Sequence, residues 1–136
     1  MQETTEIIQF LLEHDAHSNI KNMAGWTPLY YACDSLISQD YATKDGYEEE
    51  RSLKLGINTE IIKLLITYNA NPFIQVMQDN EEITPVYIVY ENSFLSEDER
   101  MGIIACLLKK EKREVSQLFL SCDDNINEFI NSLSAQ

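Results

Sequence analysis

The sequence predicts an all-α fold built from stacked helical units, because the chain repeats its own pattern. Residues 5–20 (TEIIQFLLEHDAHSNI) return 54 positions later as residues 59–74 (TEIIKLLITYNANPFI), with seven of sixteen positions identical. A second motif, GWTPLYYAC at 25–33, returns as EITPVYIVY at 82–90. Repetition at a near-fixed spacing is typical of stacked supersecondary units, each of which needs its neighbours to bury its apolar side.

Each copy of the second motif predicts the start of a short helix. Thr27 and Thr84 are both followed directly by proline. Threonine at the N-cap accepts a hydrogen bond from a free backbone N–H group, and proline in the first turn has a preset φ angle and no N–H to satisfy. We therefore expect a helix to begin after each threonine.

Longer amphipathic helices are expected from the first motif. Residues 7–12 and 61–66 carry apolar side chains at i, i+1, i+4 and i+5, which form one stripe on a helix of about three turns. A third copy of the stripe, at 103–108, follows Ser96 and Glu99, which have the spacing of a capping box. The third helix is therefore expected to begin just after Ser96.

Two further helices are expected near the C-terminal end. Apolar residues recur at helical spacing over 115–119 and again over 126–133. Asp123 and Asp124 precede the second of these segments as candidate caps. These two helices could close the stack.

The ordered motifs resemble the ankyrin repeat, in which a hairpin tip leads into a Thr-Pro-opened first helix and the second helix ends in a Gly-Ala-Asp-type turn. The segments 15–17 (Asp-Ala-His) and 69–71 (Asn-Ala-Asn) stand at these exit turns. The resemblance covers most of residues 4–110. It implies an ankyrin-like helical solenoid with short β-hairpin or loop tips and a helical C-terminal cap.

The chain also departs from that family. Tyr30 and Tyr87 replace the histidine that usually follows Thr-Pro-Leu. The sequence therefore does not indicate whether the hydrogen bonds that this histidine makes between repeats are formed. Glu82 stands where the hairpin usually has glycine. The second hairpin is therefore expected to bulge over about three extra residues.

The resemblance divides a single domain, residues 1–136, into four parts. Residues 1–21 form a half-repeat, either an N-terminal cap or the start of a piece cut from a longer array. Residues 22–78 form a complete repeat with an insertion at about 37–57, because Thr27 and Ile61 stand much farther apart than in the family. Residues 79–110 form a second repeat, and residues 111–136 form capping helices. The insertion is expected to be a loop, either a binding element or simply a tolerated one, and its Glu-rich run could start a short helix.

Composition and charge narrow the class of protein. Ten Lys and Arg oppose 23 Asp and Glu, for a net charge of −13. This charge disfavours binding to nucleic acid and to anionic membrane surfaces. No apolar run approaches the length of about 18 residues that a membrane span needs, and the N-terminal residues lack the pattern of a signal peptide.

Three cysteines, Cys33, Cys106 and Cys122, form no C-x-x-C pair, and Cys33 stands at a position that is small and buried in the family. We expect core thiols in a reducing compartment and a cytoplasmic protein. Irregular, insert-bearing ankyrin arrays resemble those of poxviruses and intracellular bacteria. This analogy implies a host-directed effector in the host cell cytoplasm.

The sequence offers little for catalysis or metal binding. His14 and His17 lie close to Asp15 in an exit turn, but no cysteine or further histidine completes a metal site. No nucleophile motif and no Gly-rich phosphate loop is present among only four glycines. We therefore expect no enzyme activity, no metal and no cofactor.

The resemblance implies a protein-binding module whose partner contacts a concave face made by the tips and the first helices. The implied partner-binding residues are His14, Lys21, Met23, Trp26, Asp34, Ser35, Tyr68, Asn80, Glu81, Ile83, Glu91 and Asn92. Trp26 and Tyr68 are the aromatic types that dominate interfaces, although Trp26 can equally pack along the base of its hairpin. The acidic residues imply a basic patch on the partner, or serve solubility alone. The alternative function is a regulatory or substrate-docking fragment of a larger enzyme whose catalytic domain lies outside this chain.

Overall fold

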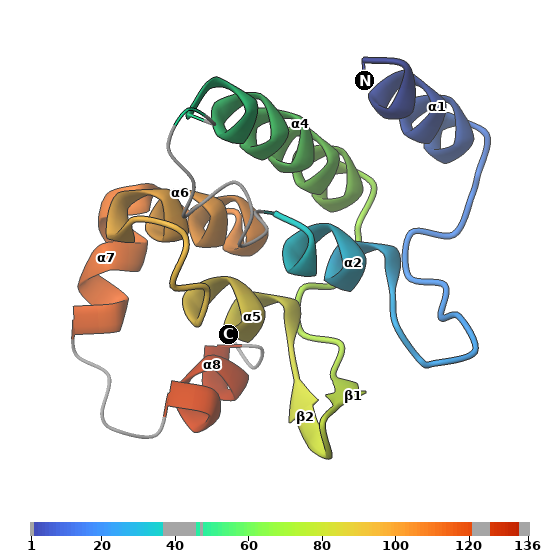
Figure 1. Ribbon diagram of the computed structural model, residues 1–136. Helices are drawn as coiled ribbons and strands as arrows, with labels where there is room; N and C mark the ends of the chain where they lie inside the picture. The colour runs from blue at the N-terminus through green and yellow to red at the C-terminus, as the bar shows by residue number, and fades with distance from the viewer. Residues whose placement is uncertain (1, 37–45, 47, 121–125, 134–136) are drawn as a thin grey trace.

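The chain is mostly helical. The computed structural model describes residues 2–36, 46, 48–120 and 126–133, and these contain seven helices and one two-stranded sheet (Figure 1). The prediction of a helical fold is confirmed. Within the described residues, no helix has both the length and the apolar composition needed to cross a lipid bilayer.

The three longest helices lie side by side in one row. These are α1 (Gln2–Glu13), α4 (Glu48–Thr67) and α6 (Glu97–Leu108), and α4 contacts both of the others. Each contains one copy of the apolar stripe seen in the sequence. The stripes place Leu12, Ile62 and Ile104 in the buried core.

A second row contains shorter helices. It is formed by α2 (Pro28–Asp34), α5 (Pro85–Tyr90) and α8 (Ile126–Leu133), with α5 in contact with both neighbours (Figure 1). Contacts of α2 with α4 and of α5 with α6 join the two rows, and α7 (Lys112–Leu120) packs against α6. Leu29, Cys33 and Val86 are fully buried in the core that the rows share.

The helix starts form as their sequences predict. The hydroxyl oxygen of Thr27 accepts a hydrogen bond from the backbone N–H of Tyr30 at 3.2 Å, and that of Thr84 accepts one from Tyr87 at 3.1 Å. Ser96 and Glu99 form the reciprocal capping box at the start of α6. These bonds satisfy backbone donors that have no partner within their own helix.

The hairpin between α4 and α5 is tighter than expected. Strands β1 (Val76–Gln78) and β2 (Glu81–Ile83) pair in continuous antiparallel register. Asp79 and Asn80 form the two-residue turn with φ angles of 52° and 67°, the left-handed conformation that suits Asp and Asn and matches the twist of the strands. The expected bulge is therefore absent from this strand pair.

The first tip is organised by one asparagine. The side-chain oxygen of Asn22 accepts hydrogen bonds from the backbone N–H groups of Ala24 and Trp26 at 2.9 and 3.0 Å. Gly25 has a φ of 84°, which glycine adopts without steric cost. In Figure 1 both this tip and the β1–β2 hairpin lie below α2, with the first tip at the lower right and the hairpin at the bottom.

The described part of the insertion is helical rather than a loop, and its helix begins at the Glu-rich run. Helix α4 begins at Glu48, so residues 48–57 are helical, while 37–45 and 47 lie outside the described residues. Three glutamates at 48–50 favour a helix start, because negative charge at the N-terminus complements the helix dipole. Arg51 also binds Glu99 of α6, which fixes this extension against the neighbouring helix.

The two exit turns are tied to each other. Asp15 and Asn69, which are equivalent in the repeat, both adopt left-handed backbone with φ angles of 67° and 70°. The hydroxyl of Ser18 donates to the carbonyl of Tyr68 at 2.9 Å, and the side chain of Asn19 bonds the backbone of Asn69 and of Asn71. These bonds hold the end of α1 beside the end of α4.

Candidate functional site

Two equivalent tyrosines lie between the helix rows and the hairpin. Tyr30 of α2 is fully buried, and its hydroxyl donates a hydrogen bond to Gln78 of β1. This bond connects α2 to the β1–β2 hairpin. Tyr87 of α5 is partly buried and lies near Glu91, which directly follows the same helix.

Four carboxylates surround these tyrosines and define what we call the acidic surface: Asp34, Asp79, Glu81 and Glu91. All four residues are exposed. Burial raises the pKa of Tyr30 to about 12, and the negative charges of Asp34 and Asp79 add to the effect. Burial likewise raises the pKa of Tyr87, and the neighbouring Glu91, followed by the charge of Glu81, adds to the effect. The ends of α2 and α5 and the hairpin therefore bring their negative charges together.

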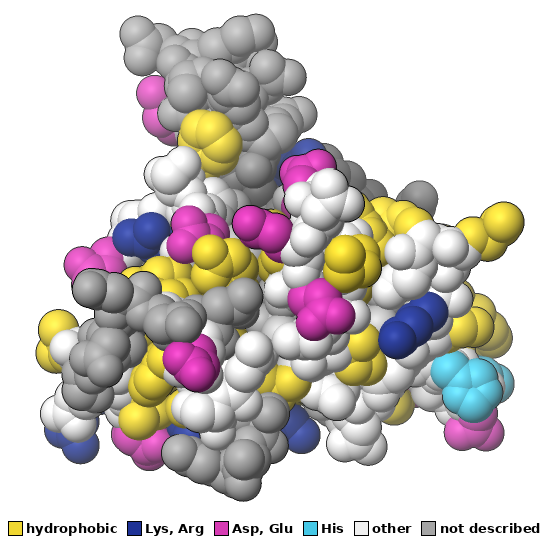
Figure 2. Space-filling view, turned by 90° about the horizontal axis from the view of Figure 1, so that it is seen from below, with side chains coloured by type: hydrophobic (Ala, Val, Ile, Leu, Met, Phe, Trp, Pro, Cys, Tyr) yellow, Lys and Arg dark blue, Asp and Glu magenta, His cyan; other side chains and the backbone are white. Residues whose placement is uncertain are grey.

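Hydrophobic side chains lie among the acidic ones on the face seen from below. In Figure 2, acidic side chains lie across the face with hydrophobic side chains between them. Met23 at the first tip is fully exposed, and Met77 of the hairpin and Tyr31 of α2 are also exposed. Methionine side chains are flexible and adapt to different apolar partners. The face therefore combines negative charge with adaptable apolar groups.

Asp34 and Cys33 illustrate opposite environments at the end of α2. Partial loss of water raises the pKa of the Asp34 carboxyl, although the residue remains exposed. Cys33 is completely buried, and burial raises the pKa of its thiol, with Asp34 adding a smaller effect. A thiol with a raised pKa stays protonated and is a poor nucleophile, which agrees with the expected core role. Cys122 lies outside the described residues.

The two aromatic residues expected as anchors are partly buried. The ring of Trp26 packs edge-on against Tyr30 at 4.6 Å and tilted against Tyr31 at 4.8 Å, between ring centroids. This is packing at the base of the first tip, the alternative considered for Trp26. Tyr68 packs against the main core at the end of α4. Only part of each ring is available to a partner.

The remaining residues of the expected set fall into three groups. Exposed are His14, Lys21, Met23, Asp34, Ser35, Asn80, Glu81 and Glu91. Asn92 is partly buried, and its side-chain oxygen accepts the backbone N–H of Phe94 at 2.9 Å, so it shapes a turn. Ile83 is buried, so its expected place on the binding face is wrong. Strand residues alternate sides, and Ile83 points inward onto Tyr30 and Val76 while Glu82 points out.

Not all of the expected residues lie at the acidic surface. His14 lies on the exit turn of α1, where its ring packs on Phe10 with centroids 4.2 Å apart. Tyr68 lies on the equivalent turn of α4. Conversely, Asp79 and Met77 belong to the face but were not in the expected set. The Asp-Asn pair at 79–80 is a turn signal that could have placed the tip at Asp79.

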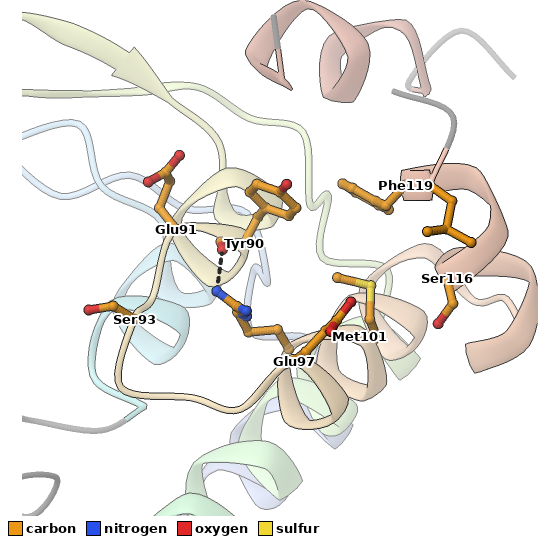
Figure 3. A pocket seen from close by; sticks show the side chains of 9 residues that line it. Tyr90, Glu91, Ser93, Glu97, Met101, Ser116 and Phe119 are labelled. Atoms are coloured by element: carbon orange, nitrogen blue, oxygen red, sulfur yellow. Dashed lines mark hydrogen bonds between the residues drawn. The ribbon is translucent and has the colours of Figure 1, made fainter. Parts of the chain in front are cut away.

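A separate pocket of about 340 Å³ lies between α5, α6 and α7 (Figure 3). Its lining includes Tyr90, Phe119 and Met101, with Glu91 and Glu97 among the polar residues. Arg100 donates a long hydrogen bond of 3.4 Å to the carbonyl of Tyr90, and its buried Nε has no partner. The pocket can offer this N–H to a polar group, while the two glutamates oppose an anion.

Side chains of the types that bind metals are spread over the described part of the chain. No three His, Cys, Asp or Glu side chains there come together in a way that could hold a metal ion. Comparisons of the chain with protein-family models, with curated proteins and with solved structures give no match.

Proposed function

We propose that the chain is an ankyrin-like helical solenoid that acts as a protein-binding module. The supporting observations are the paired contacts of α2 with α4 and of α5 with α6, and the repeated Thr-Pro helix starts. The bond from Tyr30 to the next hairpin also supports a stack of similar units. Such stacks use their tips and first helices as an extended binding face.

The acidic surface is the observation that carries the proposal. It joins the ends of both short helices and the hairpin tip in one exposed patch, as a binding face requires. The partner is a protein with a basic patch, because opposite charges speed the encounter of two proteins and select between partners. Met23 and Met77 would add apolar contacts at the tips. The proposed role involves no catalytic step, cofactor, nucleic acid or membrane, and places the protein in the cytoplasm, that of a host cell if it is an effector.

A charge-reversal experiment tests this role. The variant Glu81→Lys/Glu91→Lys reverses two charges of the acidic surface, and the matched variant Glu60→Lys/Glu111→Lys makes the same change in net charge at exposed sites elsewhere. Partners captured from a cytosolic lysate by the wild-type protein are identified, purified and measured by surface-based kinetics across a salt series.

We expect the first variant to associate several-fold more slowly and to lose most of the salt dependence, while the matched variant behaves as wild type. Melting temperatures should differ little, because exposed charges contribute little to stability. Equal association rates for both variants would show that the acidic surface serves solubility and that partners bind elsewhere.

A further inference from the structure

Helix α1 exposes an apolar stripe whose repeat equivalents on α4 are covered. The stripe consists of Ile7, Phe10 and Leu11, which are 59%, 58% and 50% exposed. Fifty-four positions later, Leu65 is 4% exposed, and Ile61 and Leu64 are partly buried against the core. The same sequence motif is therefore covered in the second unit and open in the first.

The difference has a visible cause. Helix α4 is contacted by the short helix α2 from the second row, and by α1 and α6 on either side. Helix α1 packs against α4 on one side, through the side of the helix that carries Ile8 and Leu12. Within the described residues, no helix stands to α1 as α2 stands to α4. The stripe on α1 therefore lacks the covering helix that the equivalent stripe on α4 has.

The charges beside the stripe indicate what could fill it. Glu6, Glu13 and Asp15 are exposed on α1 and its exit turn, and residues 2–13 contain no lysine or arginine. A second copy docked through α1 would bring these carboxylates against their own counterparts, and like charges oppose association. A helix with lysine or arginine beside its apolar residues would instead gain from both the stripe and the charges.

We propose that the stripe Ile7, Phe10 and Leu11 is a second docking site, which binds a basic amphipathic helix of a partner protein in the place that α2 occupies on α4. The site is separate from the acidic surface and does not depend on the function proposed for it. Binding would follow the helix-in-groove mode, with apolar residues at i, i+3, i+4 and i+7 of the partner helix as anchors. Burial of the three exposed side chains would supply the affinity, and the flanking charges would set the orientation.

A labelled peptide tests the site on the intact chain. The probe is a 16-residue peptide with leucines at i, i+3, i+4, i+7, i+8 and i+11 and lysines between them, and its control has the same composition in an order without a stripe. Fluorescence anisotropy compares the wild-type protein with Ile7→Ser/Leu11→Ser. Phe94→Ser/Leu120→Ser is the matched control, because both of its residues are also exposed and lie outside α1 and the acidic surface.

We expect saturable binding to the wild-type protein, at least tenfold weaker binding to Ile7→Ser/Leu11→Ser, and unchanged binding to the matched control. The striped peptide should also bind wild type at least tenfold more tightly than the scrambled one. Because Ile7 and Leu11 are exposed, melting curves should show that both double variants fold. Failure of the striped peptide to bind wild type, or equal binding to both double variants, would overturn the proposal. Analytical ultracentrifugation provides the remaining outcome: a dimer that Leu11→Ser disrupts would assign the stripe to self-association and refute the partner helix.

Discussion

Glu99 connects the start of α6 to the N-terminal extension of α4, and replacing it tests how firmly that extension is held. Its carboxylate binds the guanidinium of Arg51 through two hydrogen bonds of 2.7 and 3.0 Å. One of its oxygens also accepts the backbone N–H of Ser96 at 2.8 Å. Glu99→Gln keeps an acceptor for the capping bond but removes the charge, so it isolates the ion pair.

The magnitude follows from the environment of the pair. The hydrogen bonds from Arg51, and then those at Ser96, lower the pKa of Glu99 from 4.5 to about 2. A shift of that size would correspond to about 3 kcal/mol if the carboxylate were fully shielded. The side chains of Arg51 and Glu99 are 22% and 28% exposed, so water screens part of the interaction. We therefore expect a coupling free energy of about 1–2 kcal/mol in a double-mutant cycle of Glu99→Gln with Arg51→Met.

Urea denaturation at several pH values provides the measurement. Because the folded pKa of Glu99 is lowered, its contribution to stability is present above pH 4.5 and is lost as the pH falls toward 2. The difference in unfolding free energy between wild type and Glu99→Gln should thus be full at pH 7 and smaller at pH 3.5. A coupling below about 0.3 kcal/mol, or a difference that does not change with pH, would show that the pair adds nothing to the fold.

Three further predictions concern the packing of the units. Leu65→Ala should lower the unfolding free energy by about 2–5 kcal/mol and the equivalent Leu11→Ala by less than about 1 kcal/mol, as measured in urea, because only Leu65 is buried; equal losses would contradict the assigned burial. Tyr30→Phe should cost about 1–2 kcal/mol, since it removes the donor to Gln78 from a buried site, and a thermal melt that does not move would argue against that bond. Deletion of residues 48–57 should lower the melting temperature, because it removes Arg51 together with half of α4. An unchanged melting temperature would show that the segment does not contribute to stability.

Much of the helical arrangement was predictable because the decisive signals are local. Thr27 and Thr84 each cap a helix three residues from the donor that they satisfy, and Ser96 does the same with Glu99. Such bonds join residues close in sequence, so the spacing alone reveals them. The apolar stripes were equally visible, because their period follows from the geometry of the helix.

The start of α4 was harder to predict, because part of its support comes from far along the chain. Arg51 and Glu99 are separated by 48 positions, and nothing in the sequence pairs them. The hairpin shows a different difficulty. The resemblance to the ankyrin repeat predicts a bulge. Asp79 and Asn80 instead adopt left-handed backbone conformations, which Asp and Asn tolerate, and so form a tight turn. That turn fixes the register and turns Ile83 inward.

The negative charge of the candidate site could be predicted from the sequence, but the full set of residues that form it could not. Negative residues at the ends of two short helices were visible as Asp34 and Glu91. That Asp79 and Glu81 join them depends on how the hairpin folds back over Tyr30 and Tyr87, which is a matter of tertiary packing. The exposed stripe on α1 could not be found from its residues at all, because its sequence is almost that of the covered stripe on α4.

The structure separates the parts that stabilise the fold from those proposed to bind. The N-terminal extension of α4 lies at the upper edge of Figure 1, on the opposite side from the β1–β2 hairpin, and is fixed to α6 by Arg51. Changes at Arg51 should therefore alter stability while leaving the acidic surface intact. Reversal of Glu81 and Glu91 should have the converse effect, because both are exposed and make no ion pair among the described residues. If Arg51→Met slowed partner association as much as the reversal at Glu81 and Glu91 did, while the protein stayed folded, the extension itself would have to take part in binding.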